Sequence, residues 1–204
     1  MKGIELSTLE GYEEKFEKLL EAKRREIEQL QIPVEEKIQA KEQELATLKE
    51  HAVLFEDAIK LSDTLLEQIQ QVQETLNEAE KTAISQREVR KAELIRQAQA
   101  QVSVLKAGVQ NFVNRTRQLL GVTSIKVNLD EVYEICSGIY TSYVASNMVL
   151  DVAEIERIRT TKGNLWLLKE KLESIIPQLF TEQESNKKKR AIVQEQIENL
   201  IIEA

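Results

Sequence analysis

Cys136 and His51 are the single cysteine and the single histidine of this 204-residue chain, and they are the side chains best suited to nucleophilic or acid–base chemistry. A cysteine nucleophile needs a base within hydrogen-bonding reach, whereas His51 lies elsewhere, within a coiled-coil stripe. The residue three before His51 is Leu48, so the Glu-x-x-His motif of di-iron bundles is missing. The chain also lacks the motifs HExxH, paired CxxC, GxxxxGKS/T, GxGxxG and GxSxG. We therefore expect a protein without enzymatic activity, metal or cofactor.

Basic side chains gather between residues 81 and 121, where eight Lys or Arg accompany two acidic residues. Such a segment could neutralise the phosphates of nucleic acid or of an anionic membrane. The candidate residues for that contact are Arg87, Arg90, Lys91, Arg96, Lys106, Arg115 and Arg117. The alternative, which we favour, is that they face the more numerous acidic residues of the same chain or of a second chain.

A second basic run resembles a short nuclear import signal, a motif with many false positives. It consists of Lys187, Lys188, Lys189 and Arg190. If a helix begins at this run, its cations oppose the positive end of the helix dipole. Either the helix begins earlier, or the run is a recognition element for an anionic surface, and both interpretations stay open.

The stretch ICSGIYTSYVASNMVL, residues 135–150, has no charged side chain although 31% of the chain is charged. It is too short and too polar to cross a bilayer, which takes about 20 apolar residues. Small residues four apart let another helix approach closely, so the stretch is predicted to be a buried central helix. An exposed docking groove is the alternative. The candidate contacts with a protein partner are Gly138, Tyr140, Ser142, Tyr143, Ser146 and Trp166.

The candidate contact residues named above must be positioned by helices. Apolar residues recur at helical spacing from the start of the chain onward. An N-terminal amphipathic helix is predicted for residues 1–32. Its apolar stripe is Leu9, Tyr12, Phe16, Leu19, Leu20, Ile27 and Leu30. Pro33 follows, and because proline removes a helical hydrogen bond we expect a break or a kink there.

Residues 33–121 are predicted to form a long coiled-coil segment, since neither Gly nor Pro occurs from Val34 to Ala107. Apolar residues follow steps of three and four over 45–76 and again over 95–119. If the first series of steps is continued along the chain, it reaches Leu94, whereas the second series begins one residue later, at Ile95. This register break near 77–94 indicates a skip, a hinge or a hairpin turn.

The two coiled-coil parts differ in charge. Residues 1–80 carry 10 basic and 20 acidic side chains, whereas residues 81–121 carry 8 basic and 2 acidic ones. A parallel in-register homodimer would set acid against acid, so antiparallel pairing is predicted, either within one chain or between two. Because no Gly or Pro lies near residues 77–90, pairing between two chains is slightly favoured.

Residues 122–204 are predicted to form a small C-terminal helical bundle. Turns are expected after Gly121 and at residues 160–164, and Asn128 followed by Glu131 resembles a capping box at the start of the helix that contains residues 135–150. Leucine and isoleucine at helical spacing from Leu165 to Leu179 predict a further helix, which Pro177 would kink or restart. Apolar residues over 192–201 supply one more helical face.

The sequence therefore predicts an all-α fold, with a long antiparallel coiled coil followed by a small C-terminal helical bundle. Its expected function is that of a non-enzymatic scaffold or adaptor subunit. The coiled coil would self-associate or pair, as a homodimer or within a larger complex, and the C-terminal bundle would dock a protein partner. The alternative is a binder of an anionic surface, nucleic acid or membrane, through residues 81–121. A cytoplasmic location is expected, with a nuclear one suggested only by residues 187–190.

Overall fold

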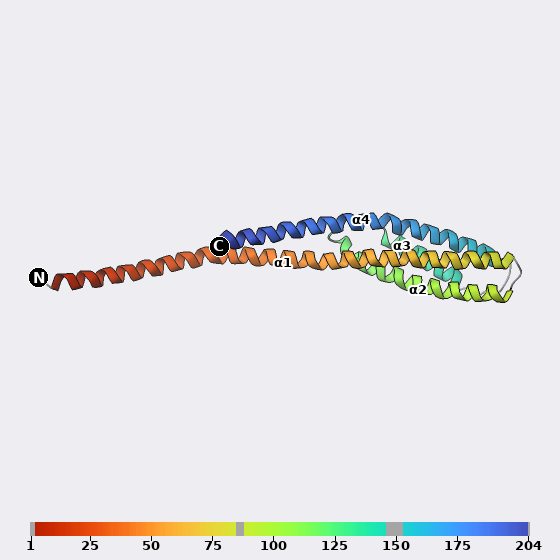
Figure 1. The fold of residues 1–204 in the computed structure, drawn as a ribbon, viewed down its shortest axis with the longest axis horizontal. Coiled ribbons are helices and arrows are strands. Elements are labelled where there is room, and N and C mark those ends of the chain that lie inside the picture. The colour runs from red at the N-terminus through yellow and green to blue at the C-terminus, as the bar shows by residue number, and fades with distance from the viewer. Residues whose placement is uncertain (1–2, 85–87, 146–152, 204) are drawn as a thin grey trace. The chain divides into compact units, whose positions relative to one another are not determined.

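The computed structural model describes residues 3–84, 88–145 and 153–203, and every regular element in these ranges is a helix. In chain order the elements are α1 (Gly3–Ile84), α2 (Glu88–Leu120), α3 (Leu129–Tyr140), the π-helix η1 (Thr141–Ala145) and α4 (Ala153–Glu203), as Figure 1 shows. The predicted all-α fold is confirmed for the described residues.

Close contacts divide the chain into two compact units. The bundle unit is Glu50–Lys187, and the paired-helix unit combines Met1–Lys49 with Lys188–Ala204. Helices α1 and α4 contribute to both units. This division differs from the predicted boundaries at residues 32 and 121. Its boundaries fall inside α1 and α4, so each of these helices belongs partly to one unit and partly to the other.

Parts of α1 and α4, together with α2, α3 and η1, form the bundle unit, and its long helices pack antiparallel (Figure 1). Near the end of α1, Glu78 and Glu80 bind Arg90 at the start of α2 and Arg159 near the start of α4. Both α2 and α4 therefore run opposite to α1. The predicted antiparallel pairing of acidic and basic segments occurs within one chain.

The slight preference for pairing these two segments between chains is thus wrong for this contact. Only residues 85–87 separate α1 from α2, and neighbouring helices in bundles need connections of as few as about two residues. A Gly or Pro is not required for such a short connection. The one-residue slip between the two apolar registers also has a simple cause, since each register belongs to its own helix.

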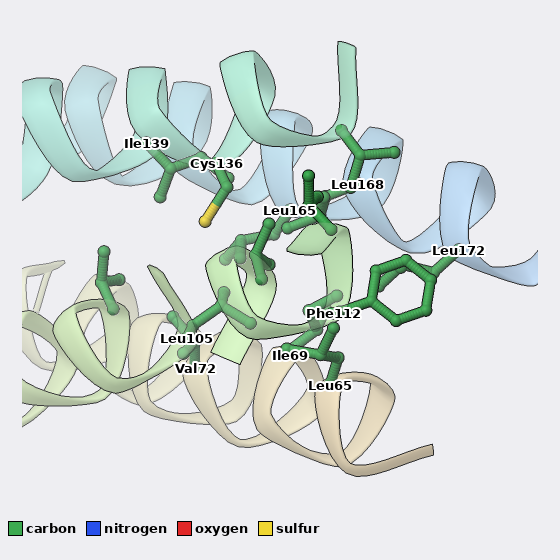
Figure 2. Packing of buried hydrophobic residues seen from close by; sticks show 14 of the residues in the cluster. Leu65, Ile69, Val72, Leu105, Phe112, Cys136, Ile139, Leu165, Leu168 and Leu172 are labelled. Carbon is green, nitrogen blue, oxygen red and sulfur yellow. The ribbon is translucent and has the colours of Figure 1, made fainter. Parts of the chain in front are cut away.

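The bundle core draws apolar side chains from α1, α2, α3 and α4 (Figure 2). Among its buried members are Leu65, Ile69, Val72, Leu105, Phe112, Cys136, Ile139, Leu165, Leu168 and Leu172. Residues on both sides of the predicted boundary at 121 thus share one core. Cys136, Ile139 and Tyr143 of the uncharged stretch are buried there, while residues 146–150 lie outside the described part.

The link between α2 and α3 follows the prediction. A turn occupies residues 121–122, and the backbone N–H of Glu131 donates to Asn128 Oδ1 at 3.2 Å, which caps α3. The extended part of this link lies against α4, where the N–H of Ser124 donates to Glu182 Oε1 and the N–H of Lys126 donates to Gln178 Oε1.

The described helices continue through the three predicted interruptions, so the break at Pro33, the restart at Pro177 and the turn at 160–164 do not occur. Pro33 lies inside α1, Pro177 lies inside α4, and the turn expected at residues 160–164 is helical within α4. Both prolines are exposed, so a backbone carbonyl that loses its helical partner can bond to water. Gly163 costs about 1 kcal/mol of helix propensity, which the burial of Leu165 beside it offsets.

In the paired-helix unit, Leu45 of α1 is buried against Val193 and Ile197 of α4. Ile38 and Leu48 pack against this small cluster. Two of the apolar residues expected on the last helical face are therefore core residues of this unit.

Candidate functional site

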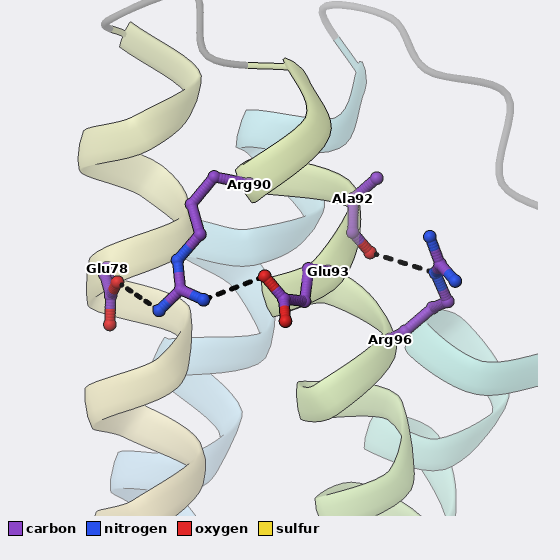
Figure 3. A network of polar contacts seen from close by, with 5 residues as sticks. All are labelled: Glu78, Arg90, Ala92, Glu93 and Arg96. Carbon is purple, nitrogen blue, oxygen red and sulfur yellow. Dashed lines mark hydrogen bonds and ion pairs between the residues drawn. The ribbon is translucent and has the colours of Figure 1, made fainter.

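The basic residues of α2 were candidates for an anionic surface, and the guanidinium of Arg90 instead bridges two carboxylates. Its nitrogens bind Glu78 of α1 at 3.0 Å and Glu93 of α2 at 2.8 Å (Figure 3). The hydrogen bond to Glu78, followed by that to Glu93, raises the pKa of Arg90. This contact joins the acidic and basic segments within one chain.

Other predicted basic candidates on α2 also meet groups of the same chain. Lys91 Nζ lies 2.5 Å from Glu154 of α4, and Lys106 Nζ lies 3.9 Å from the ring centre of Tyr140. Arg117 pairs with Asp130 at 2.5 Å, and Arg96 donates to the carbonyl of Ala92. Arg115 is exposed, and Arg87 lies outside the described residues. Much of the positive charge of α2 therefore takes part in contacts within the chain.

The run at 187–190 lies inside α4, so α4 does not begin there. Lys187, Lys188 and Lys189 are exposed, and Arg190 is half-buried. Lys187 Nζ lies 3.9 Å from Glu184 one turn earlier. The earlier start of the helix removes the unfavourable position of these cations at a helix N-terminus.

The predicted docking residues differ in exposure. Gly138 is exposed, whereas Tyr143 is buried and Tyr140 lies half-buried beneath Lys106. Ser142 is half-buried and donates to the carbonyl of Gly138 at 2.8 Å. The other two are Trp166, exposed on α4, and Ser146, outside the described residues.

A buried polar cluster lies where α2, η1 and α4 meet. Glu154 is only 1% exposed, and its charge is balanced by Lys91. Gln99 Nε2 donates to the carbonyl of Tyr143 at 3.3 Å. Burial, and then the charge of Glu154, raises the pKa of Tyr143 above its ordinary value. The cluster ties η1 and α4 to α2, and a buried charge of this kind is stable only with its partner.

Glu80 links the end of α1 to α4 through two cations. Lys162 Nζ lies 2.8 Å from one carboxylate oxygen, and Arg159 Nε lies 2.9 Å from the other. The hydrogen bond from Lys162, followed by that from Arg159, lowers the pKa of Glu80. These contacts hold α1 and α4 together at one end of the bundle.

Cys136 is buried in the bundle core, and burial raises the pKa of its thiol to about 11. At pH 8 its thiolate fraction is about 100-fold below that of an ordinary thiol, because only the deprotonated form is nucleophilic. We expect labelling by iodoacetamide at pH 8 to be at least about 100-fold slower in the folded protein than in urea. Mass spectrometry over time measures both rates, and equal rates would contradict the buried position of Cys136.

One exposed apolar feature of the paired-helix unit is on α1. Phe16, Leu19, Leu20 and Ile27 have between 44% and 64% of their surface exposed. We call these four residues the α1 apolar face. The sequence predicted an amphipathic helix from this stripe, but it did not indicate that these four side chains would be exposed.

A groove of about 460 Å³ lies in the same unit, between α1 and α4. Lys37, Ala40 and Lys41 line it from α1, and Gln196, Asn199 and Leu200 line it from α4. In α1 this groove follows the α1 apolar face, and after it comes the buried cluster around Leu45.

Comparison with protein-family models, with curated proteins and with solved structures finds no match to this chain. Within the described residues, none of the helices combines the length and the apolar character needed to span a membrane. The same residues contain no group of three or more His, Cys, Asp or Glu side chains arranged to hold a metal ion.

Proposed function

We propose that this protein is a non-enzymatic scaffold or adaptor subunit that self-associates through the α1 apolar face and offers its bundle unit to a protein partner. The observation that carries the proposal is the exposure of Phe16, Leu19, Leu20 and Ile27 on one helix. Single exposed apolar residues are common, but four large ones along one stretch of helix are typical of an interaction site.

The energetic reason is the gain from covering this face. Burying one such side chain contributes about 1.5–3 kcal/mol. The four residues recur at helical spacing, so one partner helix can cover all of them at once. Self-association through a helix pair is the simplest way to obtain this burial.

The bundle unit supports the adaptor part of the proposal. Its core is filled by apolar side chains from all its helices, which favours a well-ordered body with a constant surface. Gly138 and Trp166 are exposed on that surface and are the predicted docking residues best suited to meet a partner.

The alternative function, binding to an anionic surface through residues 81–121, has less support. Arg90, Lys91 and Arg117 each pair with a carboxylate of the same chain. Contact with phosphates would have to replace these pairs. Retention on DNA or on acidic vesicles that falls steeply with salt would nevertheless favour this alternative, because counterion release governs such binding.

Sedimentation equilibrium of the full chain tests self-association. The wild type is expected to show twice the mass of one chain, and the variant Phe16→Glu/Ile27→Glu is expected to be a monomer. Losing two buried side chains from each copy removes about 6 kcal/mol, which weakens association more than about 10,000-fold.

The matched control is Val53→Glu/Val104→Glu, which places the same two charges at exposed apolar positions of the bundle unit. This control is expected to keep the dimer mass. A wild type that remains monomeric at high concentration, or a control that dissociates as readily as the test variant, would contradict the proposal.

A further inference from the structure

We infer that the α1 apolar face is covered by the same face of a second copy, packed antiparallel and centred between Leu19 and Leu20. This rests on the proposed function, since it names the partner in the proposed self-association. In this register two residues lie opposite each other when their numbers add to about 39. Three features of α1 favour this arrangement over other partners: its length before the groove, the layering of its side chains and its charge pattern.

The length of α1 before the groove fits one copy of itself. Helix α1 begins at Gly3, and Lys37 lines the groove that α1 shares with α4. In the inferred register Gly3 of one copy lies opposite Glu36 of the other. Two such segments would overlap over about 50 Å at 1.5 Å per residue.

The side chains form matching layers in this register. Leu19 lies opposite Leu20 at the centre, and on either side Phe16 lies opposite Lys23. The described positions Phe16, Leu20, Lys23 and Ile27 follow steps of four, three and four, the spacing of a two-stranded coiled-coil seam.

Lys23 is the polar position within the stripe. Its aliphatic stem can pack along the ring of Phe16 in the second copy while its ammonium group stays in water. A single polar residue in such a seam selects one register at some cost in stability. Any other antiparallel offset would place Lys23 against a different layer and would leave Phe16 without this neighbour.

The charge pattern favours the antiparallel orientation. Residues 10–17 carry four acidic side chains and one basic side chain, and residues 22–29 carry three basic and two acidic ones. The inferred register sets these two segments opposite each other, whereas a parallel pair would set each against itself. Exposed charge pairs are weak individually, so they select orientation while apolar burial provides the affinity.

The arrangement also closes on itself. Because the same surface serves both copies, the contact is isologous and has two-fold symmetry. Both α1 apolar faces of the dimer are buried in the one contact. The dimer therefore exposes no further α1 apolar face to which a third copy could bind. A defined dimer is expected rather than a filament.

Cysteine cross-linking in the full chain tests the register, with the native Cys136 buried and slow to react. The variant Phe16→Cys/Lys23→Cys is expected to form a covalent dimer under mild oxidation, with the disulfide mapped between residues 16 and 23 of different copies. Neither single variant should do so, because seven residues separate equivalent positions by about 10 Å along the helix, beyond the reach of a disulfide. An equimolar mixture of the two single variants should again yield the covalent dimer.

The outcomes separate this inference from the proposed function. Single variants that cross-link as fast as the double variant would mean that the helices run parallel, and the inference would be overturned. A non-covalent dimer in which neither the double variant nor the mixture cross-links would overturn the register and leave self-association in place. A wild type that sediments as a monomer would overturn both, and circular dichroism of each variant checks that its helices are intact.

Discussion

The variant Lys91→Met is expected to lower the free energy of unfolding by about 3–5 kcal/mol, because it leaves Glu154 buried with an uncompensated charge. Glu154 is 1% exposed, and Lys91 is its ion-pair partner from another helix. Urea denaturation followed by circular dichroism measures the loss. The double variant Lys91→Met/Glu154→Met should regain most of it, since removing both charges replaces the pair by apolar side chains.

The control for this prediction is Arg117→Met. Arg117 and Asp130 lie as close together as Lys91 and Glu154, at 2.5 Å, but both are largely exposed. Exposed pairs contribute about 0–1 kcal/mol, so this variant should be nearly as stable as the wild type. If Lys91→Met costs no more than Arg117→Met, the bundle does not depend on the buried pair.

The variant Phe112→Ala is expected to lower the free energy of unfolding by about 3–5 kcal/mol, the usual cost of removing a large side chain from a packed core. Phe112 of α2 is fully buried and belongs to the cluster formed with Leu65 of α1 and Leu172 of α4 (Figure 2). The loss should exceed the hydrophobic transfer term alone, because a cavity remains where several helices meet.

Phe180→Ala provides the matched control, since Phe180 is the same residue type on α4 but is exposed. It should cost less than about 1 kcal/mol. Equal losses in the two variants would mean that Phe112 does not lie in the core. Both variants leave the α1 apolar face unchanged, so they probe the bundle unit and not the proposed self-association.

Helical spacing predicted much of the secondary structure and of the core. Phe112 lies on the apolar stripe predicted for residues 95–119, and Leu65 lies next to the stripe predicted for residues 45–76. Leu165, Leu168 and Leu172 lie on the stripe predicted for the last third of the chain. Local chemistry was equally informative at Asn128, because a cap depends on residues only three apart. The break expected at Pro33, the restart at Pro177 and the turn at 160–164 were wrong, since α1 and α4 continue through these positions.

The candidate sites were less predictable than the helices. The basic residues of α2 could be recognised, and their preference for acidic neighbours followed from the charge balance, but their individual partners did not. Lys91 and Glu154 lie on helices separated by a long stretch of chain. Nothing in their local spacing indicates that they meet. The burial of Tyr143, a predicted docking residue, likewise depends on helices that come from other parts of the sequence.

The sequence by itself thus determined that the chain is helical, which side of each helix is apolar, and that acidic and basic segments should run antiparallel. Only the tertiary structure decided that α1 and α2 pair within one chain, that α3 and α4 complete the same core, and that the α1 apolar face remains exposed. The physical reason is that periodicity and charge depend on near neighbours along the helix, and they define a face without naming what covers it. The covering element is selected by the packing of distant segments, which no single helix encodes.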